Sequence, residues 1–384
     1  MTDATPKIGR VKTSATTHAV IALLAGVGLL GCAGQNGSPT SVSTTSHNNA
    51  NTGVIGAANS SWEEAENSST VTQVDEWLFD STPPVPGKLL TTRNFRVFTT
   101  TTNPDLAERV PVFMEAALAH YTSAIATLPA PSGTLELYMM ANRPQWERLT
   151  QKVMGDEAGT YLRIERGGFT ARSKSILWDI GRRDTFSIAA HEGWHLYTQR
   201  AFRDSLPIAL EEGLATYMEG FRWNPRESSL PTFLPWANGE RFGQLRDAVA
   251  GERVLDIDLL LLSSPQELMS QGTQGALDYY AQVWALVHFL MEGENGMYRE
   301  PFRQLLQDTA SGALNRKIAD RLGSRAASVH NARRRGVDVL SVYTGVPTRE
   351  LDASYKAFVK RVVKTGSGQR IWRGESPIAE PTNP

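Results

Sequence analysis

Two histidines four residues apart constrain this chain more than any other feature of its sequence. The segment His191-Glu192-Gly193-Trp194-His195 places both imidazoles on one face of a helix. That spacing lets one nitrogen of each ring reach a single zinc ion, with the glutamate between them turned toward a water molecule. The alternative is an ordinary helix that carries two histidines by chance, in a chain with only seven histidines among 384 residues. We therefore expect a helix here with a metal site on one face.

The first 32 residues have the pattern of a targeting segment. Basic residues precede an apolar run, Ala19 to Leu30, which is too short to span a bilayer but suits a signal peptide. The run ends in Leu29-Leu30-Gly31-Cys32. That ending resembles the lipobox of bacterial lipoproteins, in which the cysteine is acylated. A plain signal peptide with an incidental cysteine is the alternative.

Cys32 is the only cysteine in the chain, so no disulfide can form within it. An exported domain of this kind must be stable through its core alone. A single cysteine directly after an apolar run is better explained by a lipid anchor than by redox chemistry, and several acyl chains would attach it durably. We expect an exported protein of the bacterial cell envelope, anchored to a membrane through its lipidated N-terminus.

The rest of the sequence divides by composition. Residues 33–74 are rich in Ser, Thr, Asn and Gly, which predicts a flexible tether. From residue 75 the composition is that of a globular protein, with enough residues for a substantial core. The net charge of −1 argues against nucleic acid as a partner. Several arginines between Arg316 and Arg335 are typical of a solvated helix face rather than a polyanion site.

Apolar periodicity predicts an α+β first half, 75–205, and a helical second half, 206–368. We expect a small mixed sheet with helices, packed against the helical half, and the site between them. The end of the chain, 369–384, which finishes in a Pro-rich stretch at 377–384, is expected to be disordered.

The individual elements follow from periodicity and from capping residues. Strands are expected at 95–100, 134–139, 167–171 and 175–180, with helices at 104–127 and 144–153. The helix with the two histidines should start near Asp184, a plausible N-cap. Further helices are expected at 207–220, 264–269, 276–292, 300–309 and 349–363.

A catalytic zinc needs a third protein ligand and one open position. The next helix, which Pro207 can begin, carries Glu211-Glu212-Gly213. Either glutamate could reach the metal on spacing alone. Glu211, and Glu219 farther along, could equally be solvated surface carboxylates.

The combination of His-Glu-x-x-His with Glu-Gly-x-Ala on the following helix resembles the gluzincin group of zinc metallopeptidases. This group includes thermolysin-like and aminopeptidase-N-like enzymes and has a zincin-like fold. The resemblance implies that His191, His195 and Glu212 bind zinc, because the glutamate before the glycine is the third ligand. It also implies that Glu192 is the general base. Glu219 matches a carboxylate seven residues after that ligand, which would orient another ligand.

A second match lies in Tyr280 and the long apolar stretch after it, which resembles a helix of aminopeptidase-N-like enzymes. There the phenol donates a hydrogen bond to the developing oxyanion, a contact worth about 3 kcal/mol in the transition state. Tyr279 is the neighbour that could be confused with it, and a buried core aromatic is the alternative role. His288, eight residues beyond Tyr280, is expected to be a core histidine rather than a ligand.

The resemblance covers roughly residues 90–295 and has one departure. The Gly-x-Met-Glu-Asn motif that holds a substrate's free N-terminus in aminopeptidase-N-like enzymes is missing upstream of His191, so an aminopeptidase is not implied. The strand at 167–171 or that at 175–180 would supply an edge for an extended peptide. Gly193 is unfavourable within a helix, which suggests close approach by a neighbouring element, and Trp194 is expected to pack in the core.

Together these features predict a hydrolase with one catalytic zinc ion, which cleaves peptide or protein substrates by a metal-activated water with Glu192 as general base. The rival hypothesis is a catalytically silent, lipid-anchored binding protein that retains a zincin fold.

Overall fold

The computed structural model describes residues 20–23, 71–81, 83–224, 226, 228–269 and 272–379. Cys32 and most of the predicted signal peptide and tether lie outside the described residues, as do the last five residues of the predicted tail. None of the helices in the described part of the chain combines the length and apolarity that crossing a membrane requires.

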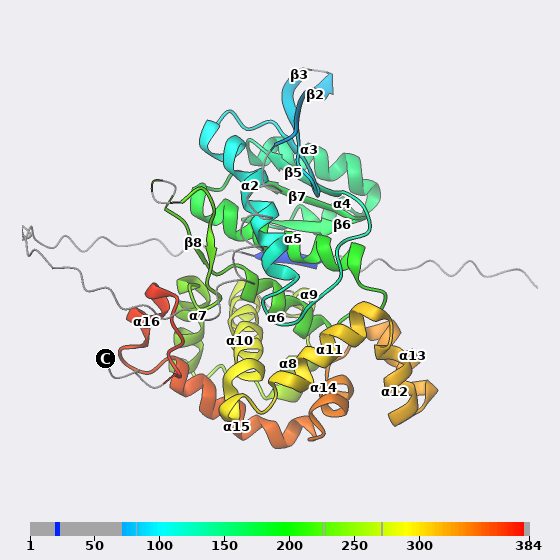
Figure 1. Ribbon diagram of the computed structural model, residues 1–384, viewed down its shortest axis with the longest axis vertical. Helices are drawn as coiled ribbons and strands as arrows, with labels where there is room; N and C mark the ends of the chain where they lie inside the picture. The colour runs from blue at the N-terminus through cyan, green and yellow to red at the C-terminus, as the bar shows by residue number, and fades with distance from the viewer. Residues whose placement is uncertain are drawn as a thin grey trace, which may run out of the picture.

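The first half of the protein is built on a seven-stranded mixed sheet with the order β1-β6-β7-β5-β4-β3-β2 (Figure 1). Strands β4, β5 and β7 run parallel to one another, and the other neighbours are antiparallel. The strands are β1 (Val20–Leu23), β2 (Gln73–Ser81), β3 (Pro84–Thr91), β4 (Phe95–Thr99), β5 (Leu135–Met140), β6 (Gly167–Ala171) and β7 (Lys174–Trp178).

The four strands expected from the sequence are present as β4 to β7, whereas the hairpin β2–β3 was not predicted. Its first residues, Gln73 and Val74, fall at the end of the predicted tether. Two prolines and a glycine lie within β3, and these residues weaken the strand pattern. Pairing with β4 on the other side holds β3 in the sheet despite them.

Helices cover both faces of this sheet. On one face lie α2 (Pro104–Tyr121) and α5 (Arg182–Ala201), and on the other lies α3 (Arg143–Met154), followed by the short η1 (Gly155–Glu157) and α4 (Ala158–Tyr161). The second face has its own apolar cluster, in which Trp146 packs on Trp178 at 4.5 Å between ring centroids. The helix expected at 104–127 ends at Tyr121, because the hydroxyls of Thr122 and Ser123 bond to carbonyls one turn back.

The second half is helical apart from the small hairpin β8 (Phe221–Arg222) and β9 (Thr232–Phe233). Helix α10 (Thr273–Glu292) is almost entirely buried and packs against α6 (Ile208–Met218), and the remaining helices surround this pair (Figure 1). They are α7 (Gly239–Ala250), α8 (Ile257–Leu262), α9 (Pro265–Met269), η2 (Gly293–Gly296), α11 (Arg299–Ser311), α12 (Leu314–Leu322), α13 (Ser324–Arg333), α14 (Val337–Thr344), α15 (Thr348–Val362) and α16 (Ser367–Arg373).

Helix α16 corrects the expectation that a disordered tail begins at residue 369. The Ile371 side chain is buried, and the Arg222 guanidinium donates hydrogen bonds to the carbonyls of Ile371 and Trp372. These contacts fix the helix against the β8 hairpin, so the ordered second half extends beyond residue 368.

Helix α5 joins the two halves, because it packs against the sheet, α2 and α6. It begins at Arg182 after Gly181 rather than at an Asp184 N-cap, since the Asp184 carboxylate pairs with Arg166 instead of capping the helix. The expected burial of Trp194 is confirmed. A Cβ at Gly193 would lie 2.5 Å from Met114 Cε, which confirms the close approach of α2.

Candidate metal centre

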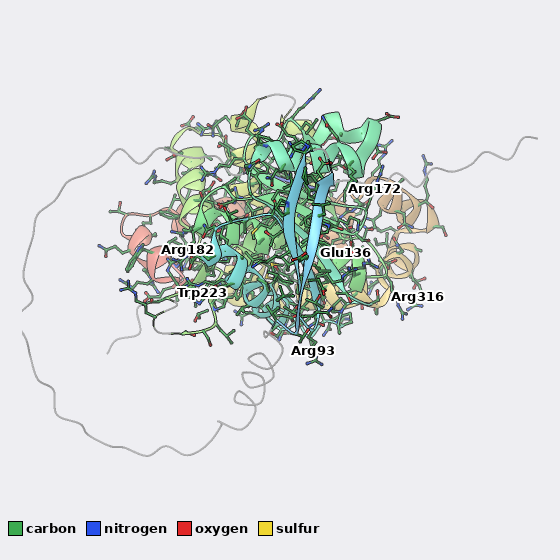
Figure 2. The ribbon with its side chains drawn as sticks, turned by 90° about the horizontal axis from the view of Figure 1, so that it is seen from above. Arg93, Glu136, Arg172, Arg182, Trp223 and Arg316 are labelled. Atoms are coloured by element: carbon green, nitrogen blue, oxygen red, sulfur yellow. The ribbon has the colours of Figure 1, made fainter. Side chains whose placement is uncertain are left out.

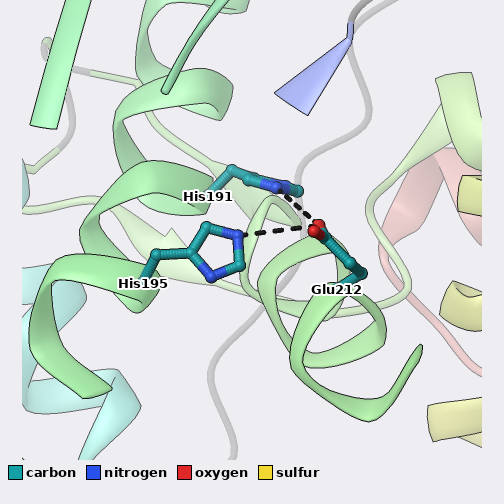
Figure 3. A group of neighbouring side chains, drawn as sticks. All are labelled: His191, His195 and Glu212. Carbon is teal, nitrogen blue, oxygen red and sulfur yellow. Dashed lines mark ion pairs between the residues drawn. The ribbon is translucent and has the colours of Figure 1, made fainter. Parts of the chain in front are cut away.

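Three side chains from two helices converge at the junction of the two halves. His191 and His195 project from the same face of α5, and Glu212 faces them from α6 (Figure 3). The Oε2 atom of Glu212 lies 3.4 Å from His191 Nε2 and 3.6 Å from His195 Nε2. One ligand atom from each residue lies within 4.8 Å of the other two, so this triad could hold a metal ion.

Apart from these long contacts with one another, the three atoms are buried and have no hydrogen-bond partner in the described part of the chain. Burying a polar atom without a partner is costly, so such atoms call for a ligand. Two imidazole nitrogens and one carboxylate oxygen form a donor set that suits zinc. The residues therefore fit a zinc ion with three protein ligands.

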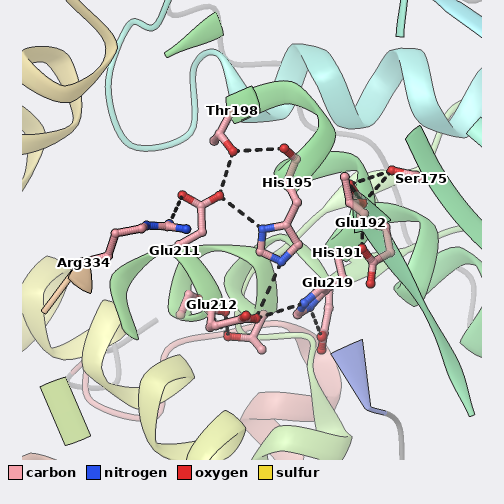
Figure 4. Close-up of polar contacts among 12 residues, drawn as sticks. Ser175, His191, Glu192, His195, Thr198, Glu211, Glu212, Glu219 and Arg334 are labelled. Atoms are coloured by element: carbon pink, nitrogen blue, oxygen red, sulfur yellow. Dashed lines mark hydrogen bonds and ion pairs between the residues drawn. The ribbon is translucent and has the colours of Figure 1, made fainter. Parts of the chain in front are cut away.

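The far side of the His191 ring is held by a buried chain of charged groups. Its Nδ1 lies 2.8 Å from Glu219 Oε1, which leaves Nε2 directed at the triad (Figure 4). Glu219 in turn accepts hydrogen bonds from Arg241 at 2.7 and 3.0 Å and from Asn238 at 2.7 Å. Arg241 is fully buried, so its charge is balanced within the protein. Such a carboxylate fixes the orientation and tautomer of a metal-binding imidazole.

A second carboxylate does the same for His195. Its Nδ1 lies 3.2 Å from Glu211 Oε1, which also accepts a hydrogen bond of 2.7 Å from Thr198. Arg334 approaches the other oxygen of Glu211 at 3.7 Å. Glu212 thus faces both free nitrogens, whereas Glu211 supports a ring from behind. Glu211 and Glu219 are buried, in contrast to the alternative of solvated surface carboxylates.

The surrounding charges favour a cation at the triad. Burial by itself lowers the pKa of His195, but contacts with Glu211 and Glu212 raise it to about 10. Burial likewise opposes ionisation of Glu219, but Arg241 and His191 lower its pKa to about 2. A proton or a metal ion is therefore stabilised at this position, and the two compete for the same nitrogens.

Glu192 lies beside the triad with one oxygen bound and one free. Its Oε2 is 2.7 Å from the Thr170 hydroxyl on β6, and Oε1 has no partner among the described residues. Ser175 on β7 donates to the Glu192 carbonyl at 3.0 Å, so the sheet holds both the backbone and the side chain here. Burial raises the pKa of the Glu192 carboxyl, although the two neighbouring histidines act in the opposite direction.

Of the two adjacent tyrosines, the structure brings Tyr280 to the site. Its ring centroid lies 6.0 Å from that of His191, and the Arg241 guanidinium lies 5.2 Å from the Tyr280 ring centroid. The Tyr279 hydroxyl is directed elsewhere and donates to the Ser263 carbonyl at 3.4 Å. His288 is buried and stacks on Trp236 at 3.5 Å, as expected of a core histidine, and does not belong to the triad.

Close packing of α6 on α10 sets the position of Glu212. A Cβ on the next residue, Gly213, would lie only 2.6 Å from the Val283 carbonyl oxygen of α10. Any larger residue would push the two helices apart. The glycine after the third candidate ligand thus has a physical reason in this chain.

Sequence reasoning missed the side chains that support the site from a distance. Arg241 follows Glu219 by 22 positions, and Thr170 precedes Glu192 by 22. No helical or strand spacing connects residues so far apart. The one usable signal was Asn238, whose side chain caps α7 by accepting from the Arg241 amide and so places Arg241 in the first turn.

Comparison with known proteins gives a partial match. Residues 187–311 match a family model described as a protein of unknown function, DUF1570. The matched range is less than half of the chain, but it includes the triad, Glu192 and Tyr280. None of the curated proteins matches this chain.

Proposed function

We propose that this protein is a zinc-dependent peptidase with a zincin-like arrangement of sheet, site helix and ligand-bearing second helix. The observation that carries the proposal is the convergence of three buried atoms, from His191, His195 and Glu212, that have no hydrogen-bond partner among the described residues. The free oxygen of Glu192 lies beside them. Two further carboxylates hold the imidazoles in the orientation that metal binding needs.

His191, His195 and Glu212 would hold the zinc ion. When bound, zinc supplies Lewis-acid chemistry and lowers the pKa of a water molecule to about 7. The protein's part is to fix the ligands before any substrate arrives. Buried pairs with Glu211 and Glu219 do so, because a ring that is hydrogen-bonded at Nδ1 cannot turn away.

Glu192 is the general base in this proposal. The Thr170 hydroxyl fixes Oε2, so Oε1 remains available to accept a proton from water and pass it to the leaving amine. Tyr280 would donate a hydrogen bond to the developing oxyanion. Burial keeps the pKa of its phenol well above the usual value, so the hydroxyl retains its proton.

Strand β6 offers the edge along which a peptide would lie. In the structure β1 pairs antiparallel with β6, and Val20 lies opposite Thr170, the residue that contacts Glu192. An extended substrate would pair with β6 in the same way. β1 falls within the predicted signal peptide. Cleavage of that peptide would remove β1 and free the edge of β6 for substrate. Export and anchoring through Cys32 belong to the same proposal.

The substitution Glu192→Gln tests the function. We expect hydrolysis of a peptide library to fall by a factor of about 10²–10⁴, because the amide cannot accept the proton. Zinc content should remain at one ion per chain, because Glu192 is not a ligand. Glu300→Gln, at an exposed position on α11, is the control and should retain full activity. A wild-type protein that binds zinc and cleaves no peptide would refute the proposal in favour of a silent binding protein.

A further inference from the structure

A pocket rich in arginine lies away from the metal triad, between the N-terminal ends of α2 and α5 and the β8 hairpin. It has a volume of about 730 Å³. Figure 2 shows Arg182 and Trp223 from its lining on the same side of the molecule. We call it the arginine pocket after its five lining arginines, Arg109, Arg182, Arg183, Arg222 and Arg226.

The positive charge of the arginine pocket is only partly balanced. Asp105 pairs with both Arg109, at 2.8 Å, and Arg182, at 3.0 Å. In the described part of the chain, Arg183 and Arg226 take part in no ion pair, and both side chains are exposed. Among the described residues, Asp105 is the one acidic side chain that pairs with any of the five arginines.

Arg222 contributes charge without free donors. Its guanidinium is fixed by backbone carbonyls, including those of Trp372 at 3.0 Å and Ala237 at 3.2 Å. Partial burial lowers its pKa, and the nearby charge of Arg183 lowers it further. Two cations held this close together favour an anion between or beside them.

The remaining walls are aromatic. Trp223 lies beneath the Arg109 guanidinium at 5.6 Å, and its ring is 5.2 Å from Phe186. Trp372 is 74% exposed, which is unusual for so large an apolar side chain. Arginine side chains bind carboxylates, and indole faces pack against apolar atoms. A pocket that combines the two suits a peptide with acidic side chains.

The arginine pocket and the metal triad share one helix and differ in charge. Arg183 precedes His191 by eight positions on α5, a rise of about 12 Å. Three further buried carboxylates surround the triad, from Glu192, Glu211 and Glu219, so most of the charged side chains beside it are acidic. The excess of positive charge at the arginine pocket therefore attracts an acidic substrate side chain. An extended chain advances about 3.3 Å per residue, so at least three to four residues separate the two positions.

We propose that the arginine pocket binds acidic side chains of the substrate, at least three residues from the bond that is cut. The proposal rests on the peptidase function above and specifies its substrate class as acidic peptides. The side chains of the pocket are sufficient to recognise such a peptide. Its carboxylates pair with Arg183 and Arg226, and its apolar parts pack against the aromatic residues of the pocket.

Binding is tested on the full chain carrying Glu192→Gln, so that hydrolysis does not intervene. The probe is a fluorescein-labelled ten-residue peptide with three glutamates at one end, compared with the same peptide carrying glutamines. Adding Arg183→Gln and Arg226→Gln should weaken binding of the acidic peptide about fivefold to tenfold and leave the neutral peptide unaffected. The control pair, Arg316→Gln with Arg325→Gln, removes two exposed arginines elsewhere, and Figure 2 shows Arg316 on the opposite side.

The outcomes separate this proposal from the peptidase function. Equal affinity for the two peptides, or an equal loss in the control pair, overturns the pocket's role. Displacement of the acidic peptide by inorganic pyrophosphate at a much lower concentration than by unlabelled peptide also overturns it, in favour of a phosphorylated ligand. A wild type that cleaves acidic and neutral peptides equally well overturns the substrate class and keeps the peptidase. If binding depends on the arginines but the wild type cleaves no peptide, the peptidase function alone is overturned.

Discussion

The metal triad and the arginine pocket lie along the same helix but hold their charges differently. At the triad the charged side chains are buried, and each carboxylate behind a histidine has at least one further partner. At the arginine pocket two of the cations are exposed and lack an acidic partner among the described residues. Water screens the exposed charges at the pocket more strongly than the buried charges at the triad. Replacing a charged residue should therefore change stability more at the triad than at the pocket.

Arg241 provides the largest expected difference. Replacing it by methionine leaves Glu219 as a buried carboxylate without its cation, and we expect a loss of about 3–5 kcal/mol in the free energy of unfolding. Arg183→Met in the arginine pocket should change stability by no more than about 0.5 kcal/mol. Chemical denaturation of the two variants measures both values. Adding Glu219→Gln to the first variant should restore part of the loss, and similar losses at Arg241 and Arg183 would remove the distinction between the sites.

Zinc removal should have the next largest effect. A ligand that binds only the folded state, at a free concentration one hundred times its dissociation constant, adds about 2.7 kcal/mol to the free energy of unfolding. We therefore expect a chelator to lower the thermal midpoint by several degrees. The double variant His191→Ala with His195→Ala is the control, and its midpoint should not respond to zinc. A chelator effect that persists in this variant would place the stabilising metal elsewhere.

A substitution at Gly213 tests how rigidly α6 packs against α10 beside the triad. Gly213→Ala puts a methyl group against the Val283 carbonyl, and overpacking of this kind costs about 1–3 kcal/mol. The control is Gly243→Ala on α7, where an added Cβ would have no neighbouring atom within 4 Å. Alanine within a helix is more favourable than glycine by up to about 1 kcal/mol. Urea unfolding distinguishes the two variants. An unchanged Gly213→Ala protein would show that α6 and α10 can separate, and that Glu212 is less firmly placed than its contacts suggest.

The sequence predicted those parts of the molecule that depend on local spacing. Two histidines at helical spacing face one side of α5, and Glu212 comes from α6, the next helix along the chain. Apolar periodicity likewise predicted α10 and strands β4 to β7. In each case the evidence lies within one element or between neighbours in the chain.

Contacts between segments far apart in the sequence could not be predicted from it. Arg241 and Thr170 reach the site only because the tertiary fold brings α7 and β6 to it. The arginine pocket draws on α2, α5, the β8 hairpin and α16, and no single segment carries its pattern. Helix α16 itself depends on Arg222, 150 positions away from Trp372 in the sequence. Periodicity describes one element at a time and contains no information on such pairs.

The central claim is that His191, His195 and Glu212 bind zinc, and X-ray absorption at the zinc edge tests it most directly. We predict one zinc per chain, with imidazole scattering from two histidines and the remaining ligands oxygen at about 2.0–2.2 Å. In His195→Ala the imidazole contribution should fall, and zinc should be lost on dialysis. A protein that takes up no zinc, or whose spectrum is the same in the wild type and in His195→Ala, would contradict the account.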